Sequence, residues 1–163
     1  MKKNISIILT TFLLVTAACA LETSGNSTAS TGSTAAASTK GETNMNKTTR
    51  VKITVKGKTL YAAFDDNTTS RAIIAQIPMT LPMLDLYGDE MCYRYPQTLP
   101  TDSVKSYIHK KGEIFYWPPR HSFVIRYVST NEKLDIQHIG QIESGVEIFD
   151  GIGNVDVKFE IDE

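Results

Sequence analysis

The sequence has few of the residues that build disulfide scaffolds or metal cages. It contains two cysteines and three histidines in 163 residues. Small disulfide-rich domains need several cysteine pairs, and structural zinc sites need repeated ligand pairs at short spacings. His109, His121 and His138 lack the spacing of two or four residues that would place two ligands on one face. We therefore expect no disulfide framework, no metal site and no cofactor.

An excess of charge of one sign is also missing. The chain carries 17 Lys and Arg against 18 Asp and Glu, which gives a formal net charge of -1. Proteins that bind nucleic acid by charge need clustered basic residues, because their affinity comes largely from released counterions. The balance excludes nucleic acid as an expected partner, and the length suits one modest globular domain.

Long hydrophobic runs are absent as well. The most apolar stretch, residues 5–15, follows Lys2 and Lys3 and precedes a group of small residues. As a helix of about 11 residues it would be roughly 16 Å long, whereas a membrane span needs about 20 residues. The order of basic, apolar and small residues is typical of a secretory signal peptide. We expect residues 1–20 to direct export.

Residues 15–19, VTAAC, resemble the lipobox of bacterial lipoproteins, although Thr16 replaces the usual aliphatic residue. The resemblance implies that Cys19 accepts a diacylglyceryl group and anchors the exported chain in the cell envelope. Ala20, which is not acidic, favours the outer membrane if two membranes are present. The alternative is ordinary cleavage after Ala20 at the small residues around Cys19, which would release a soluble secreted protein.

The segment that follows lacks large apolar residues. Residues 22–47 are mainly Ser, Thr, Ala, Gly and Asn, and no aromatic residue occurs between Phe12 and Tyr61. Such a segment cannot bury enough surface to offset its ordering entropy. A flexible coil of about 26 residues spans on the order of 30 Å. We expect residues 21–48 to form a disordered tether to a folded domain over residues 49–163.

The folded part alternates short strand patterns with turns. Residues 51–55 alternate in polarity and Gly57 follows them, which predicts an opening hairpin with residues 59–64. A short helix capped by Thr69 or Ser70 is expected to end at Pro78. Further strands are expected over residues 79–84, 91–95, 112–117, 122–129, 135–142 and 155–161, with a second short helix near residues 145–149. This pattern predicts a mainly β, mostly antiparallel barrel.

The order of these motifs resembles the bacterial cyclophilin-like domain family. The motifs are LYGDE at residues 86–90, LPTD at 99–102, GEIFYWPP at 112–119, FVIRY at 123–127 and IGQI at 139–142. The resemblance covers residues 51–160 and implies a small closed β-barrel with one or two short flanking helices. It does not extend to the Phe-x-x-Gln-Gly-Gly segment beside the catalytic arginine of true cyclophilins, which this sequence lacks. No catalytic residue is therefore carried over.

Aromatic and guanidinium side chains are the candidate ligand contacts. Tyr93 and Tyr95 share one face of an expected strand while Arg94 takes the other, and the Pro-Pro turn holds Trp117 rigidly. The structural alternative is that the aromatics pack the barrel and the arginines are solvated. The candidate binding residues are Tyr93, Arg94, Tyr95, Tyr116, Trp117, Arg120, His121 and Arg126.

Cys92 is the thiol that remains in the domain once Cys19 is lipidated. A nucleophilic cysteine needs a histidine base, and no local signature supplies one. We expect Cys92 to be buried and inert.

Together these features predict an exported, lipid-anchored cyclophilin-like domain that binds a peptide or a small molecule. Two alternatives stay open: a prolyl isomerase with a degenerate active site, and an accessory domain that makes only protein contacts. A deep pocket with a buried arginine would favour catalysis, a shallow aromatic groove would favour binding, and an exposed apolar patch would favour a protein partner.

Overall fold

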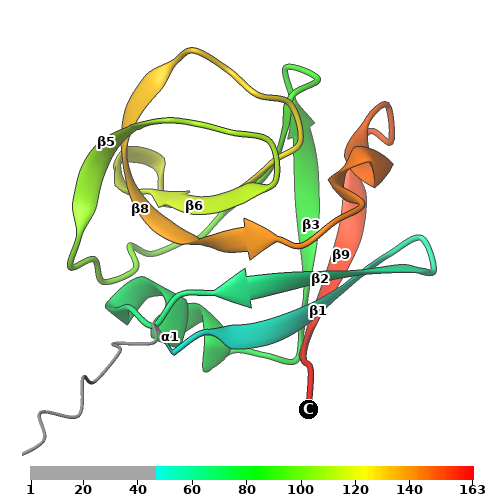
Figure 1. The fold of residues 1–163 in the computed structure, drawn as a ribbon, viewed down its shortest axis with the longest axis horizontal. Helices are drawn as coiled ribbons and strands as arrows, with labels where there is room; N and C mark the ends of the chain where they lie inside the picture. Colours follow the sequence, from blue (N-terminus) through cyan, green and yellow to red (C-terminus); the bar gives the residue numbers. More distant parts are fainter. Residues whose placement is uncertain (1–46) are drawn as a thin grey trace, which may run out of the picture. The chain divides into compact units, whose positions relative to one another are not determined.

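The computed structural model describes residues 47–163, which form a closed, mainly antiparallel β-barrel (Figure 1). This confirms the fold class expected from the sequence. The expected signal peptide over residues 1–20, the lipidation site Cys19 and nearly all of the tether over residues 21–48 lie outside the described residues. Within residues 47–163, no helix is both long and apolar enough to cross a membrane.

One continuous sheet closes on itself to make the barrel. Its strands are β1 (Thr49–Val55), β2 (Lys58–Phe64), β3 (Met79–Leu86), β4 (Glu90–Arg94), β6 (Glu113–Trp117), β7 (Ser122–Arg126), β8 (Lys133–Ile142) and β9 (Val155–Ile161). They follow the order β2-β1-β9-β3-β4-β7-β6-β8, and β2 pairs with β8 to close the ring. A further strand, β5 (Val104–Ile108), pairs with the first half of β8 at the edge of the sheet (Figure 1).

The helical segments differ in detail from the sequence prediction. The α-helix α1 (Thr68–Ile74) is capped by Asn67, not by Thr69 or Ser70. The Asn67 side chain accepts a hydrogen bond from the Ser70 amide at 2.9 Å, so the cap lies two to three residues earlier than expected. The second expected helix is a single 3-10 turn, η2 (Val146–Phe149), and another, η1 (Pro118–Arg120), follows β6.

Strand β5 was not predicted from the sequence. Its residues, VKSYI, are all exposed, so no buried face imposes an alternating pattern on them. The strand exists because its backbone pairs with β8, which is a tertiary contact that local sequence does not report.

Aromatic and branched side chains fill the inside of the barrel. Phe123 lies near its centre, with its ring centroid 6.5 Å from that of Phe64 and 5.6 Å from that of Phe159. All three rings are fully buried. They come from β7, β2 and β9, so Phe123 connects β7 with two strands that each lie three places away around the closed sheet.

Gly140 allows the barrel to close. It lies in β8, opposite Phe64 of β2 and Ile114 of β6. A Cβ atom at this position would lie 2.1 Å from the Ala63 carbonyl oxygen and 2.9 Å from the Phe64 Cα. Backbone atoms cannot move aside as a flexible side chain can, so β2 and β8 approach this closely only because residue 140 is glycine.

We expect Gly140→Ala to lower the free energy of unfolding by about 2–3 kcal/mol, because the added methyl group forces the closing strands apart. Urea denaturation followed by the fluorescence of Trp117 measures the change. Gly153→Ala is the control: its φ is +71° and nothing lies within 4 Å of an added Cβ. The control adds backbone strain alone, about 1 kcal/mol. Equal losses in the two variants would contradict the role of Gly140 in closure.

Candidate functional site

The wall formed by β4, β7 and β6 is buried on both of its faces. Met91, Ile114 and Ile125 point into the barrel and are fully buried in the main core. The neighbouring residues point outward and form a second, smaller hydrophobic cluster made of Cys92, Phe115, Val124 and Ile136. A barrel wall whose outer face carries apolar side chains is a natural floor for a ligand.

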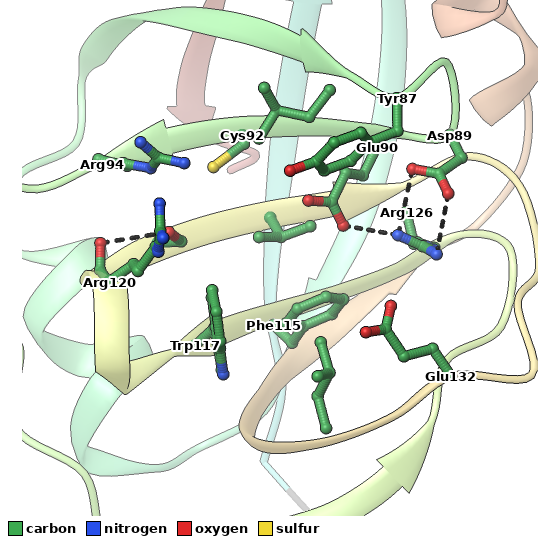
Figure 2. Close-up of a pocket in the computed structure, with 14 residues that line it drawn as sticks. Tyr87, Asp89, Glu90, Cys92, Arg94, Phe115, Trp117, Arg120, Arg126 and Glu132 are labelled. Atoms are coloured by element: carbon green, nitrogen blue, oxygen red, sulfur yellow. Dashed lines mark hydrogen bonds and ion pairs between the residues drawn. The ribbon is translucent and has the colours of Figure 1, made fainter.

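A cleft of about 280 Å³ opens over this outer face, and we name it the outer cleft (Figure 2). It is lined by Leu86, Tyr87, Asp89, Glu90, Cys92, Arg94, Phe115, Trp117, Arg120, Ser122, Val124, Arg126, Glu132 and Leu134. Small-molecule sites are commonly about 300–1,000 Å³. The outer cleft is therefore the size of a small ligand or a short peptide segment.

Strand register sorts the lining residues into rows across β4, β7 and β6. The rows are Glu90 and Arg126; Cys92, Val124 and Phe115; and Arg94, Ser122 and Trp117. Residues two apart in a strand share a face, so the three rows follow one another along the cleft. Figure 2 shows the result: carboxylates around Arg126 at one end, an apolar middle, and Arg94 with Arg120 at the other end. We name these parts the acidic end, the apolar floor and the arginine end.

The guanidinium of Arg126 is held tightly at the acidic end. Its side chain is 4% exposed. Its Nη1 donates to Glu90 Oε2 at 2.6 Å and to Asp89 Oδ1 at 3.3 Å, and its Nη2 donates to Asp89 Oδ2 at 3.2 Å. Its Nε donates to the Val128 carbonyl at 3.1 Å. A guanidinium has five N–H donors, and these contacts occupy most of them. Arg126 is therefore engaged within the protein.

Carboxylates outnumber guanidinium groups at the acidic end. Asp89, Glu90 and Glu132 line it together with Arg126. Burial raises the pKa of Glu90 above its ordinary value, and Arg126 opposes this shift only in part, while Asp89 adds to it. The main cause of the raised pKa is that Glu90 lies in a partly buried site, where water stabilises its ionised form less than at the surface.

Arg94 and Arg120 form the arginine end. Arg94 lies at the end of β4 and Arg120 lies in η1, directly after the two prolines. Both side chains are exposed. Among the ion pairs of residues 47–163, none includes either arginine, whereas Arg50, Arg71 and Arg126 are all paired. A guanidinium without a partner beside an apolar surface is a ready donor for a carboxylate.

The residues of the apolar floor, Cys92, Val124 and Phe115, are almost fully buried. Cys92 and Phe115 are each 1% exposed and Val124 is 2% exposed. Cys92 is buried, as the sequence predicted, and its burial raises the pKa of the thiol, which disfavours the reactive thiolate. Leu86, Trp117 and Leu134 pack against this cluster from the sides.

A buried histidine supports the floor. The His109 ring stacks on Phe115 with a centroid distance of 4.4 Å and an interplanar angle of 20°. His109 is 1% exposed, and neither of its ring nitrogens has a hydrogen-bond partner among residues 47–163. Burial, and secondarily the charge of Arg126, lowers its pKa. His109 is thus a neutral packing group.

Four of the eight candidate residues come together at the outer cleft. Arg94, Trp117, Arg120 and Arg126 all line it. They lie on three different segments, β4, the β6–η1 corner and β7, which the barrel brings side by side.

The other four candidates lie elsewhere. Tyr116 is fully buried in the core, and its hydroxyl accepts a hydrogen bond from the Leu99 amide at 2.9 Å. Tyr93 and Tyr95 also face the core side, where their rings meet edge to face at 5.0 Å. His121 ends η1 with a φ of 51° and is not part of the cleft lining. The three tyrosines therefore pack in or against the core, which was the structural alternative to ligand contact.

Sequence reasoning missed the carboxylates and the apolar floor. A signal was present in β4, where Glu90, Cys92 and Arg94 alternate with Met91 and Tyr93 and so share one face. Asp89 lies in the turn before β4 and Glu132 directly before β8, and only the fold brings both to the cleft.

A second hollow, of about 330 Å³, is lined by residues that include Asp65, Ser103, Tyr107 and His138. His138 Nδ1 lies 2.7 Å from Asp65 Oδ2, and Asn67 Nδ2 donates to the His138 carbonyl at 2.9 Å. These contacts join the start of α1 to β8. The hollow has no apolar floor, so it is a weaker candidate than the outer cleft.

The comparisons with known proteins agree with this architecture. The profile of the cyclophilin-like family matches residues 53–160. The chain therefore belongs to the cyclophilin-like family. A hypothetical protein from Archaeoglobus fulgidus, known from its solution structure, superposes with a TM-score of 0.58 at 16% identity, over 74% of this chain and 99% of that one. At this identity the likeness shows the fold alone. No curated protein matches the sequence significantly.

The lowered pKa of His109 predicts a pH dependence of stability. The unfolded chain, in which the histidine pKa is about 6.5, binds the proton more readily than the folded one. The part of the stability that is linked to His109 is therefore fully present above this value, and it is lost as the pH drops toward the folded-state pKa. We expect His109→Phe to remove this part of the loss between about pH 7 and pH 5. Urea denaturation at several pH values measures it.

The control variant is His121→Asn, since asparagine tolerates the left-handed backbone of residue 121. This variant keeps His109 and so keeps the share of the pH dependence that His109 supplies. An unchanged loss on acidification in His109→Phe would show that His109 is not the group responsible.

Proposed function

We propose that this cyclophilin-like domain is a binding module that takes a peptide or a small molecule in the outer cleft. The observation that carries the proposal is an apolar floor bordered by two arginines that form no ion pair with any carboxylate of residues 47–163. Ligand sites typically combine a mostly apolar surface with a few polar groups that fix orientation. The outer cleft has both parts, and its polar groups differ in sign at its two ends.

The contacts of Arg126 argue against catalysis as its role. A prolyl isomerase uses a guanidinium that is free to stabilise a twisted amide, whereas Arg126 is occupied by Asp89, Glu90 and the Val128 carbonyl. No histidine lines the outer cleft to activate Cys92. Arg94 and Arg120 are exposed and point to recognition. Prolyl isomerisation remains the alternative, and the binding test below distinguishes it from binding without catalysis.

A specific observation keeps the accessory-domain alternative in view. Val104, Tyr107 and Ile108 of β5 are 43%, 38% and 53% exposed. They lie on an edge strand, and exposed apolar edges are places where another strand adds. This surface is distinct from the outer cleft, because no β5 residue lines the cleft.

For the location of the protein, we propose export and lipid anchoring at Cys19. The order of the leader residues and the small residues before Cys19 support this. A lipid anchor followed by a segment poor in apolar residues would present the barrel in the aqueous space of the cell envelope.

We expect Cys19→Ala to abolish labelling of the protein by a fatty-acid analogue and to move it out of the membrane fraction, because the acyl acceptor is lost. Metabolic labelling followed by fractionation tests this. Cys92→Ala removes the buried thiol and should label like the parent. Undiminished labelling of Cys19→Ala would exclude the lipid anchor.

The binding proposal predicts chemical-shift changes confined to the outer cleft when the purified protein meets its ligand class. A panel of short peptides, with and without Xaa-Pro bonds, and small organic acids serves as the probe set in NMR titrations. Trp117→Ala should weaken binding about tenfold or more, since a half-buried aromatic at a site contributes well over 1 kcal/mol. Tyr107→Ala, outside the cleft, should not.

Exchange spectra of the Xaa-Pro peptides distinguish the alternatives in the same samples. Binding without faster cis/trans exchange supports a binding module, and accelerated exchange would replace the proposal with isomerase activity. Shifts gathered on β5, or around Asp65 and His138, would place the ligand site elsewhere.

A further inference from the structure

The two ends of the outer cleft carry opposite excess charge. At the acidic end Asp89, Glu90 and Glu132 face the single guanidinium of Arg126, so negative charge is in excess. At the arginine end Arg94 and Arg120 line the cleft with no paired carboxylate among the described residues. Figure 2 shows the two groups on opposite sides of Cys92 and Phe115. A ligand complementary to this cleft carries a cation at one end and an anion at the other.

The strand geometry sets the separation of the two charges. Glu90 and Arg94 lie on the same face of β4, four residues apart. At a rise of about 3.3 Å per residue, their Cα atoms are about 13 Å apart. An extended peptide spans at most about 3.3–3.6 Å per residue, so three or four residues bring an α-amine and an α-carboxylate to this distance.

The middle of the cleft determines what lies between the charges. Leu86, Trp117 and Leu134 supply partly exposed apolar surface around the nearly buried floor of Cys92, Val124 and Phe115. An extended peptide alternates its side chains, so a central side chain faces this floor, and an apolar residue suits that position. A nucleotide or a dicarboxylate would place negative charge against Glu90, and a polyamine would place positive charge against Arg94.

The surroundings of Glu90 agree with a cationic partner. Burial raises its pKa most, Asp89 adds to the rise, and the ion pair with Arg126 offsets it only in part. An ammonium group beside it would stabilise the ionised form. Acidification that protonates Glu90 would weaken the attraction for an amine.

We propose that the outer cleft binds a short extended peptide of three or four residues with both termini free, its carboxylate at Arg94 and Arg120 and its amine at the acidic end. This inference rests on the proposed function and names its ligand class. It distinguishes a free peptide from an internal segment of a protein, because an internal segment brings neither terminal charge.

Four forms of one tetrapeptide, Ala-Val-Leu-Ala, test the proposal: free at both ends, N-acetylated, C-amidated, and blocked at both ends. Titration of the purified protein by NMR and calorimetry gives the affinity of each form. The free peptide should bind best, each block should cost about tenfold, and the doubly blocked form should bind most weakly, because each block removes one terminal charge. Dipeptides should bind more weakly than tri- and tetrapeptides.

Variants assign each terminus to its end of the cleft. In the double variant Arg94→Gln and Arg120→Gln, the free and the amidated peptides should bind alike, while acetylation still weakens binding. In Glu132→Gln, the penalty for acetylation should shrink while the penalty for amidation stays. Arg94, Arg120 and Glu132 are exposed, so the fold is expected to tolerate these changes. Lys105→Gln, an exposed charge outside the cleft, is the control and should keep both penalties.

The outcomes separate this inference from the proposed function. If all four forms bind the outer cleft equally, the free-termini inference is overturned and the binding module stands. If no peptide or small molecule of the wider panel shifts the cleft residues, the proposed function fails as well. Affinity that rises steadily beyond four residues would also overturn the inference, since it would indicate a longer groove.

Discussion

The antiparallel register of β4, β7 and β6 is the constraint on which the rest depends. In each strand, one set of alternate residues completes the core and the other set builds the outer cleft. The pairing that places Met91 opposite Ile125 inside the barrel also places Cys92 opposite Val124 outside it. A slip of one residue would exchange the two faces of a strand. Stability and the candidate site are therefore fixed by the same hydrogen-bond ladder.

Unequal pairing of charge gives the cleft its direction. Burying the Arg126 guanidinium is costly unless carboxylates and carbonyls satisfy it, and Asp89, Glu90 and Val128 do so. Those carboxylates then create a negative end, with Glu132 beside them. Arg94 lies four residues further along the same face of β4 and forms no ion pair within residues 47–163. Under the proposed function, the paired Arg126 is a structural charge, and Arg94, which has no ion pair among the described residues, is a recognition group.

The sequence predicted the fold well, because its main signals are local. Alternation and turn residues located the opening hairpin and the last strand, and the order of motifs indicated the cyclophilin-like family, which the family profile confirms. Asn67 replaced Thr69 or Ser70 as the cap, since all three are good capping residues and local pattern does not choose among them. Strand β5 stayed hidden because tertiary pairing alone creates it.

The candidate site was predictable only in part. Alternation placed Tyr93 and Arg94 on opposite faces, yet it does not say which face the core covers. The core covers the tyrosine face, so the arginines and not the tyrosines reach the cleft. Asp89 and Glu132 are separated by more than forty positions in sequence and meet only across the folded sheet. Whether two residues so far apart in sequence line one cleft depends on the strand topology, which local sequence does not determine.

A crystal structure of the protein with Ala-Val-Leu-Ala, free at both termini, tests the central claim most directly. The account predicts an extended peptide lying along β4, with its carboxylate within hydrogen-bond distance of Arg94 or Arg120 and its amine beside Glu90. A peptide bound in the reverse direction, or seated away from the outer cleft, would contradict it.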